Sequence, residues 1–166
     1  MNGVPLDKRH GAPLRAVVPG WFGMASTKWL TRIRVEATSS DNHFMAKGYR
    51  YAYPGVDPLT APPVETLRVK SIITSPLEGA LLAHGKRVQV RGFAWAGRPG
   101  VKSVEVSIDG GASWRAARLT GEAHPGAWRS WEAQVDAVMP GDLSLLARAT
   151  DGTGEVQPMT ARANAG

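Results

Sequence analysis

Four polar side chains able to bind an anion lie in the otherwise apolar stretch 10–30, HGAPLRAVVPGWFGMASTKWL: His10, Arg15, Ser26 and Lys28. An arginine presents a planar fork of donors and a lysine presents a point charge, and together they suit a phosphate or another oxyanion. The glycines of this stretch would let backbone amides approach the same ligand closely. These residue types therefore predict anion binding.

Each of the four residues also has a structural interpretation. A single loop histidine commonly hydrogen-bonds to the backbone, most arginines and lysines are surface charges, and a serine can cap a turn. The stretch has neither a helical period nor a strict alternation, and its glycines and prolines interrupt any long element. Spacing alone leaves both interpretations open.

Composition limits the classes of function. The chain has 166 residues, a formal net charge of +6 and a pI near 10.1, which suggests anionic partners. Its positive charges are scattered, so no nucleic-acid-binding stripe is indicated. The absence of cysteine excludes disulfides and thiolate metal ligands from this chain. No apolar run approaches the roughly 20 residues that span a bilayer, so we expect neither a nucleic-acid nor a membrane partner.

Two parts of different composition are joined by a proline-rich stretch. Residues 1–53 are irregular and rich in glycine and aromatic residues, and we expect one short strand there, Trp29–Val35. Residues 54–66, PGVDPLTAPPVET, hold four prolines and predict an extended connector. Residues 67–166 show the alternation of an all-β domain.

The second part predicts a β-sandwich of immunoglobulin type. Asp109-Gly110-Gly111 between two alternating runs indicates a hairpin, because such tight turns need positive φ angles. Six or seven short strands separated by turns are typical of the immunoglobulin-like sandwich. We expect strands at 68–74, 86–95, 101–108, from 113 onward, 128–135 and 143–150.

The sequence of residues 2–33, NGVPLDKRHGAPLRAVVPGWFGMASTKWLTRI, closely resembles the molybdenum-cofactor domain of the sulfite oxidase family. That family typically reads N-G-x-P-L, then H-G-x-P-L-R-x-V-V-P-G-W-x-G, then S-x-K-W-L. Further segments, VKSIITSP, VRGFAWAG, VEVSIDGGASWRAARL and ARATDGTGEVQP, resemble successive strands of the family's immunoglobulin-like dimerisation domain. The resemblance implies a mainly β chain. Residues 1–53 would be the irregular C-terminal part of a mixed α+β molybdopterin-binding domain, and 67–166 a dimerisation domain truncated at its end.

The resemblance also implies a cofactor and its ligands. In this family molybdopterin is held by His, Arg, Ser and Lys from this segment, which correspond here to His10, Arg15, Ser26 and Lys28 set into an interior cleft. The segment KGYRY resembles the one that carries an active-site tyrosine, which points to Tyr49 as a catalytic residue. The family chemistry transfers an oxygen atom from molybdenum to sulfite, giving sulfate.

The sequence departs from the family at the metal. The family binds molybdenum through a cysteine in the earlier half of the domain, and this chain has no cysteine and no other assigned metal ligand. We therefore expect a fragment that is inactive alone and shares its cofactor with a missing N-terminal half. We also expect Val17, Val18, Trp21 and Phe22 to expose apolar surface.

Two hypotheses about function follow. The first is part of a sulfite-oxidising molybdenum enzyme, working as a homodimer on a small oxyanion with a haem or cytochrome as electron acceptor. The second is a stand-alone immunoglobulin-like dimerisation or partner-binding module with a vestigial cofactor arm. The resemblance makes the periplasm a plausible location for the parent protein.

Overall fold

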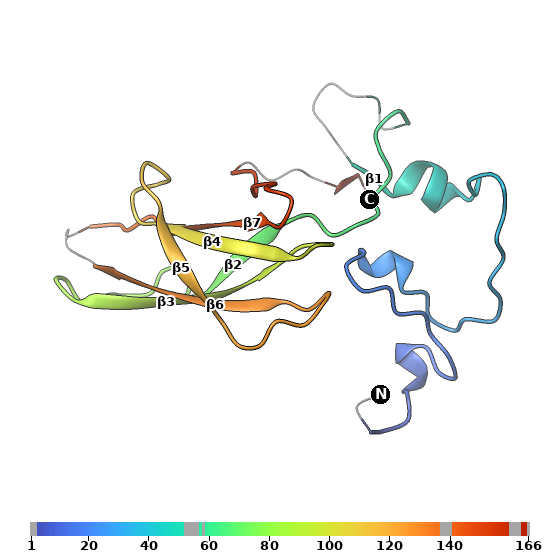
Figure 1. The fold of residues 1–166 in the computed structure, drawn as a ribbon, viewed down its shortest axis with the longest axis horizontal. Helices are drawn as coiled ribbons and strands as arrows, with labels where there is room; N and C mark the ends of the chain where they lie inside the picture. The colour runs from blue at the N-terminus through green and yellow to red at the C-terminus, as the bar shows by residue number, and fades with distance from the viewer. Residues whose placement is uncertain (1–2, 52–56, 58, 137–140, 160–163, 166) are drawn as a thin grey trace. The chain divides into compact units, whose positions relative to one another are not determined.

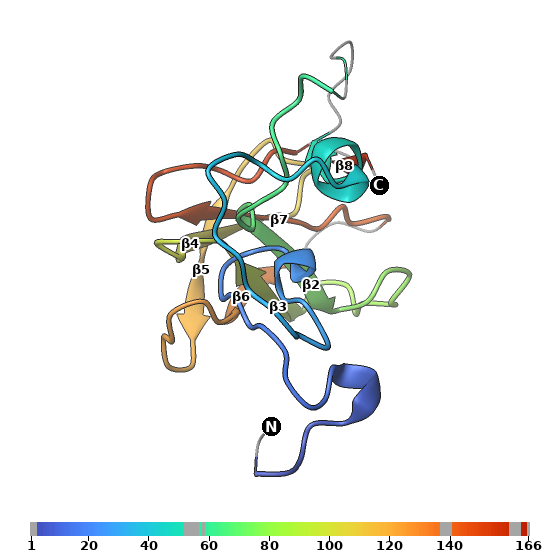
Figure 2. The same cartoon turned by 90° about the vertical axis from the view of Figure 1, so that its right-hand side faces the viewer.

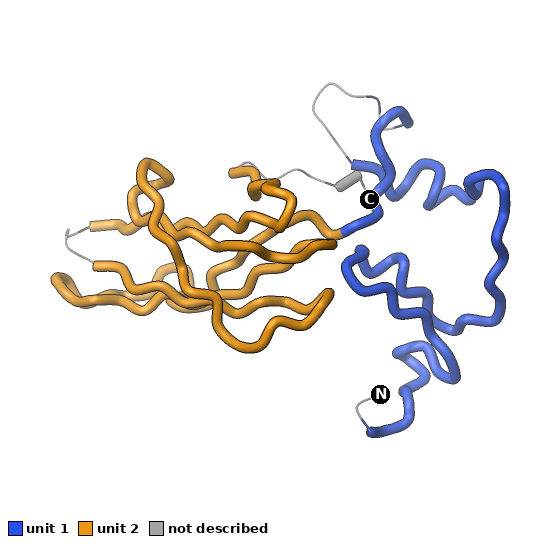
Figure 3. The backbone as a smooth tube through the Cα atoms, viewed as in Figure 1, with its two compact units in different colours: residues 1–66, 160–166 blue, residues 67–159 orange. Residues whose placement is uncertain are grey.

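The computed structural model describes residues 3–51, 57, 59–136, 141–159 and 164–165. Two compact units make up the chain (Figure 3): unit 1 consists of residues 1–66 with 160–166, and unit 2 consists of residues 67–159.

Unit 2 is built from six antiparallel strands, β2 (Lys70–Ser75), β3 (Arg87–Trp95), β4 (Val101–Ser107), β5 (Arg115–Thr120), β6 (Arg129–Asp136) and β7 (Leu146–Asp151). Their order in the sheet is β2-β3-β6-β5-β4-β7. In Figure 1, β3 and β6 form one layer and β4 and β7 the other, and Figure 2 shows the same strands after a turn of 90°. The sheet thus folds over on itself, and the predicted mainly β sandwich is confirmed.

The core of unit 2 lies between these layers and follows from alternation along the strands. In β3, Val90, Gly92 and Ala94 are buried, whereas Arg91 and Phe93, which alternate with them, are exposed. Val104 and Val106 of β4 reach the same core from the opposite layer. Trp131 of β6 is 1% exposed and faces Gly92, its register partner in β3.

Aromatic side chains also gather on the outer surface of unit 2. The indoles of Trp95 and Trp128 stack with ring centroids 4.5 Å apart and planes 18° from parallel. Phe93 lies beside them, its ring centroid 6.2 Å from that of Trp128. Phe93 and Trp128 are both exposed, so this cluster is a surface feature.

The predicted strands of unit 2 are observed, with their ends shifted by at most three residues. The hairpin at Asp109-Gly110-Gly111 connects β4 to β5, which pair antiparallel with Val106 opposite Arg115. Gly110 and Gly111 have φ angles of 69° and 99°, the conformation that the turn was expected to need.

Unit 1 contains short elements: η1 (Lys8–His10), η2 (Gly23–Ala25), the π-helix η3 (Phe44–Gly48), and β1 (Arg50–Tyr51) paired with β8 (Asn164–Ala165). Among its described hydrophobic residues, Tyr51, Ala61 and Val64 are buried. No helix in the described parts of the chain is long and apolar enough to cross a membrane.

The predicted strand Trp29–Val35 is wrong. Trp29 has a φ angle of 51°, outside the extended region, and Ile33 and Val35 are 78% and 98% exposed. The Leu30 amide donates to the Leu14 carbonyl at 2.9 Å, but no ladder continues from there. A β-prone sequence forms a strand only where a neighbouring backbone pairs with it, and the described residues supply none along this stretch.

The end of the proline-rich stretch packs into unit 1. The Val64 amide donates to the Tyr49 carbonyl at 2.9 Å, and Phe22 donates to the Glu65 carbonyl at 3.0 Å. Ala61 and Val64 are 1% and 4% exposed. The apolar side chains of Ala61 and Val64 are therefore part of the buried surface of unit 1. Most of the predicted connector before residue 59 lies outside the described residues.

Candidate functional site

Two loops of unit 1 carry the anion-binding candidates, and backbone hydrogen bonds hold the loops together. The Ala16 amide donates to the Thr27 carbonyl at 2.9 Å, and the Trp29 amide donates to the Gly11 carbonyl at 3.3 Å. The Asp7 carboxylate caps the first turn, η1, by accepting from the Arg9 amide at 2.7 Å. Residues separated by more than ten positions in the sequence are thereby brought side by side.

Arg15 fastens these two loops through its guanidinium. Its Nη1 donates to the His10 carbonyl and its Nη2 to the Ser26 carbonyl, both at 3.1 Å. Arg15 is half-buried, so the planar group is fixed in orientation. Three of the four predicted residues therefore meet at one side chain, although His10 and Ser26 contribute backbone oxygens to these contacts.

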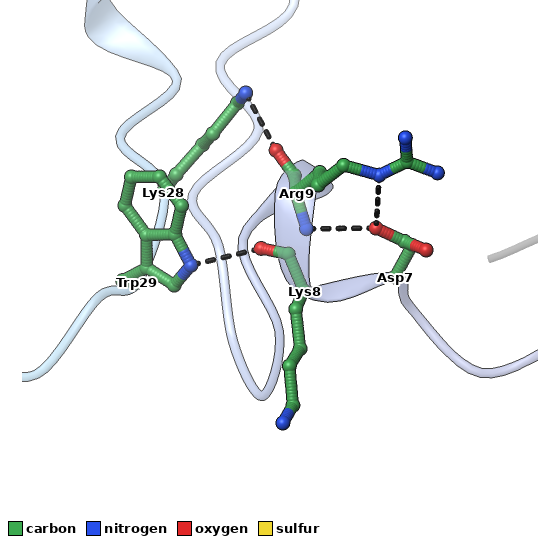
Figure 4. A network of polar contacts seen from close by, with 5 residues as sticks. All are labelled: Asp7, Lys8, Arg9, Lys28 and Trp29. Carbon is green, nitrogen blue, oxygen red and sulfur yellow. Dashed lines mark hydrogen bonds and ion pairs between the residues drawn. The ribbon is translucent and has the colours of Figure 1, made fainter.

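Lys28 extends the same cluster toward the first turn (Figure 4). Its Nζ donates to the Arg9 carbonyl at 2.8 Å, and the indole Nε1 of Trp29 donates to the Lys8 carbonyl at 2.9 Å. The sequence-based reasoning missed this role of Lys8, Arg9 and Trp29. The sequence held no clear signal for this contact, because Trp29 is 58% exposed and an exposed indole N–H can bond to water instead.

Gly11 allows the side chains of Arg15 and Lys28 to pack closely against its backbone. Its φ angle is 106°, and a Cβ at this position would lie 2.9 Å from the Lys28 Cβ and 3.2 Å from the Arg15 Cβ. Gly11 is buried between them. Only glycine allows the left-handed backbone and the close approach together.

Ser26 and His10 differ in what their side chains do. The Ser26 hydroxyl accepts a hydrogen bond from the Val18 amide at 3.2 Å, which fits the turn-capping interpretation. His10 and Lys28 are exposed rather than set in an interior cleft. Arg15 and Ser26 are the half-buried members of the four, and no described contact joins the His10 ring to the other three side chains.

The cluster is cationic. Lys8, Arg9, Arg15 and Lys28 lie on these loops, and Asp7 forms an ion pair with Arg9 at 3.4 Å. This donor set fits a phosphate-bearing anion, because guanidinium and ammonium groups are gathered on the two loops that pack around Gly11. The set does not fit a metal ion. Within the described ranges no group of three or more His, Cys, Asp or Glu residues is placed to hold one.

Tyr49 lies apart from the cluster in its contacts. It ends η3, where its ring stacks on Phe44 with centroids 5.8 Å apart, and 36% of its surface is exposed. Among the described residues, no hydrogen bond or ring contact connects Tyr49 with His10, Arg15 or Lys28. Its catalytic role stays a prediction.

The apolar surface predicted around the cluster is observed in part. Val17 and Trp21 are 65% and 39% exposed, whereas Val18 and Phe22 are half-buried. The ring of Phe22 lies edge-on to that of Tyr51, with centroids 6.5 Å apart, which covers part of it.

The chain combines an immunoglobulin-like sandwich with a preceding loop segment that carries a cationic cluster, and two known families match these two parts. Residues 1–44 match the oxidoreductase molybdopterin-binding domain, and residues 61–165 match the Mo-co oxidoreductase dimerisation domain. The chain belongs to this family of dimerisation domains, and its resemblance to the sulfite oxidase family is confirmed.

Individual relatives agree with this assignment. The chain is 40% identical to mitochondrial sulfite oxidase of Mus musculus over 172 residues and to that of Rattus norvegicus over 173, each alignment covering 96% of the chain and 31% of the relative. In the solved structure of the sulfane dehydrogenase SoxCD from Paracoccus pantotrophus, a chain is similar with a TM-score of 0.81 and 36% identity, over 95% of this chain and 40% of that one. The chain therefore spans about a third of the length of these curated relatives.

Proposed function

We propose that this chain is part of a molybdenum-cofactor oxidoreductase of the sulfite oxidase type, one that converts sulfite to sulfate. One observation carries the proposal. The chain joins a molybdopterin-binding match to a dimerisation match, and the first contains Arg15 and Lys28 packed around Gly11. When bound, the molybdenum cofactor supplies oxygen-atom transfer and accepts two electrons. The residues of this chain would bind and orient it.

The roles of the individual residues follow from their donors. Arg15 is held by three backbone carbonyls, those of His10, Ser26 and Ala16, so its remaining N–H groups would present a positive charge of fixed direction to a phosphate. Lys28 adds a second charge from the neighbouring loop. The His10 ring and the Ser26 hydroxyl supply hydrogen bonds. Tyr49 would position the oxyanion substrate through its phenol.

The proposal extends to partners. The dimerisation domain supports a homodimer through unit 2, and a haem or cytochrome would accept the electrons. A periplasmic location of the parent protein belongs to the same proposal. Because the sequence has no cysteine, a metal-binding thiolate would have to come from outside these residues, and we propose that the chain alone does not turn over sulfite.

The test uses the product of the intact coding region around this sequence. We expect it to contain molybdenum by elemental mass spectrometry and to reduce ferricyanide in the presence of sulfite. Arg15→Met and Lys28→Met should each lower the molybdenum content several-fold. Arg34→Met is the matched control, because the Arg34 side chain is 70% exposed and pairs only with Glu36 in the described contacts. A product without molybdenum would overturn the proposal.

The alternative is a dimerisation or partner-binding module that needs no cofactor, which the match of residues 61–165 to the dimerisation domain supports. Both hypotheses predict a dimer of the 166-residue chain in analytical ultracentrifugation, so the molybdenum content and the sulfite-dependent turnover of the intact product distinguish them. A dimer whose intact coding region yields no metal and no sulfite-dependent turnover would support the module.

A further inference from the structure

The two edge strands of the unit 2 sheet lie next to each other without a shared ladder. The strand order places β2 at one end and β7 at the other, and these two strands nevertheless pack together. An edge strand directs unpaired backbone groups outward. Ser71 of β2 and Ala149 of β7 are 5% and 0% exposed, so water does not readily reach their amides. Buried amides of this kind need a hydrogen-bond partner.

Gln157 supplies that partner with its side chain. Its Oε1 accepts from the Ser71 amide at 2.6 Å and from the Ala149 amide at 3.3 Å, and its Nε2 donates to the Ser71 carbonyl at 3.4 Å. The Gln157 backbone amide also donates to the Ala149 carbonyl at 2.8 Å. One carboxamide thus bonds to both edges, as a peptide group of an intervening strand would.

A tight loop fixes where Gln157 lies. The Asp151 Oδ1 accepts from the Thr153 amide at 2.8 Å and from the Glu155 amide at 2.9 Å, and the Asp151 amide donates to the Glu155 carbonyl at 3.0 Å. These contacts turn the chain back so that Val156 pairs with Thr150 as an antiparallel bridge. The glutamine that follows therefore lies opposite Ala149.

We propose that Gln157 is a strap that closes the sandwich and shields both sheet edges from pairing with another chain. The carboxamide is suited to this role because one oxygen can accept two hydrogen bonds while the nitrogen donates. An apolar side chain of the same length would leave the Ser71 and Ala149 amides unpaired. The exposed edges would then accept a strand from a second copy. The inference stands independently of the proposed function.

The test measures hydrogen exchange and self-association of the full chain. In the wild type, the Ser71 amide should exchange far more slowly than a free amide, although it belongs to an edge strand. Gln157→Met should speed exchange at Ser71 and Ala149 at least about tenfold, because both bonds are lost. It should also form concentration-dependent oligomers larger than those of the wild type. Gln134→Met is the matched control, since Gln134 is exposed on β6.

Gln157→Glu keeps the accepting oxygen and loses the donor, so it should retain most of the protection at Ser71 and Ala149. Unprotected Ser71 in the wild type would overturn the proposal without any variant. Equal protection in Gln157→Met and the wild type would overturn it as well. If Gln157→Met does not fold while Gln134→Met does, the wild-type exchange and Gln157→Glu still decide the question.

Discussion

At the scale of single residues, the cationic cluster depends on a glycine as much as on its charges. The chemistry of Arg15 and Lys28 and the family resemblance identify them as candidate anion-binding residues, but the sequence does not predict their hydrogen bonds. Both donate to backbone carbonyls of residues distant in the sequence, and carbonyls carry no sequence signal. The exposure of His10 and Lys28 likewise depends on the packing of the loops, which residue type alone does not predict.

Substituting Gly11 tests this dependence. Gly11→Ala should separate the two loops and raise the exchange rate of the Leu30 amide, which bonds to Leu14, by about tenfold or more. The matched control is Gly3→Ala. Gly3 also has a positive φ angle, +80°, but nothing lies within 4 Å of its added Cβ. If both variants changed the exchange at Leu30 equally, backbone strain alone would account for the effect.

A second glycine matters in the core of unit 2. A Cβ on Gly92 would lie 2.0 Å from the Ile72 carbonyl oxygen and 2.4 Å from the Trp131 ring. Since the backbone atom cannot move aside cheaply, Gly92→Ala should lower the free energy of unfolding by about 3 kcal/mol. Urea unfolding measures it. Gly23→Ala, where nothing lies within 4 Å of the added Cβ, is the control and should leave the unfolding of unit 2 unchanged. A loss of less than about 1 kcal/mol in Gly92→Ala would contradict the packing argument.

At the scale of elements, alternation predicted the strands of unit 2 because most of them have one buried face, and β5 packs the partly buried Ala117 and Leu119 against the core. The same reasoning failed at Trp29–Val35, where β-prone residues lack a pairing neighbour and Trp29 adopts a positive φ angle. It also missed the single-turn elements η1, η2 and η3, which are too short to show a period. The prediction of the hairpin at Asp109 is confirmed, because the residues that form the turn are adjacent in the sequence.

The β4–β5 turn should make stability depend on acid. Hydrogen bonds from the Ser107 hydroxyl, and then from Ser113, hold the pKa of Asp109 well below its usual range. A lowered folded pKa adds stability above the unfolded value, near 4, and the contribution is lost as the pH falls through the folded pKa. Asp109→Asn should therefore be less stable than the wild type at neutral pH, and the difference should shrink below about pH 4.

Thermal unfolding monitored from about pH 7 to about pH 2 measures this difference. Asp142→Asn, an exposed residue outside the turn, is the control and should remain close to the wild type. A gap between Asp109→Asn and the wild type that stays constant over this range would mean that the carboxyl stabilises the turn only as a hydrogen-bond acceptor.

At the scale of the whole molecule, the two units differ in how much they bury. Unit 2 has a continuous core that includes Val90, Val104 and Trp131, whereas Val17, Ile33 and Val35 of unit 1 are largely exposed. Apolar burial is the main favourable term in folding, so unit 1 should open at a lower free energy than unit 2.

Limited proteolysis followed by mass spectrometry tests this order. We expect early cleavage within residues 3–51 and a resistant product close to residues 67–159. Resistance of both units to the same protease concentration would contradict it. The same digestion of the product of the intact coding region is the comparison. If further chain covers apolar residues such as Val17, cleavage near them should be slower there than in the 166-residue chain.

The stacked indoles of Trp95 and Trp128 have a consequence for spectroscopy. Two indoles whose rings lie 4.5 Å apart couple their electronic transitions, and such coupling produces circular dichroism that does not originate in the backbone. The far-ultraviolet spectrum of this chain should therefore carry an exciton signal from one surface of unit 2. That signal would report the docking of the segment before β6 against β3, and Trp128→Phe should abolish it while the strands remain.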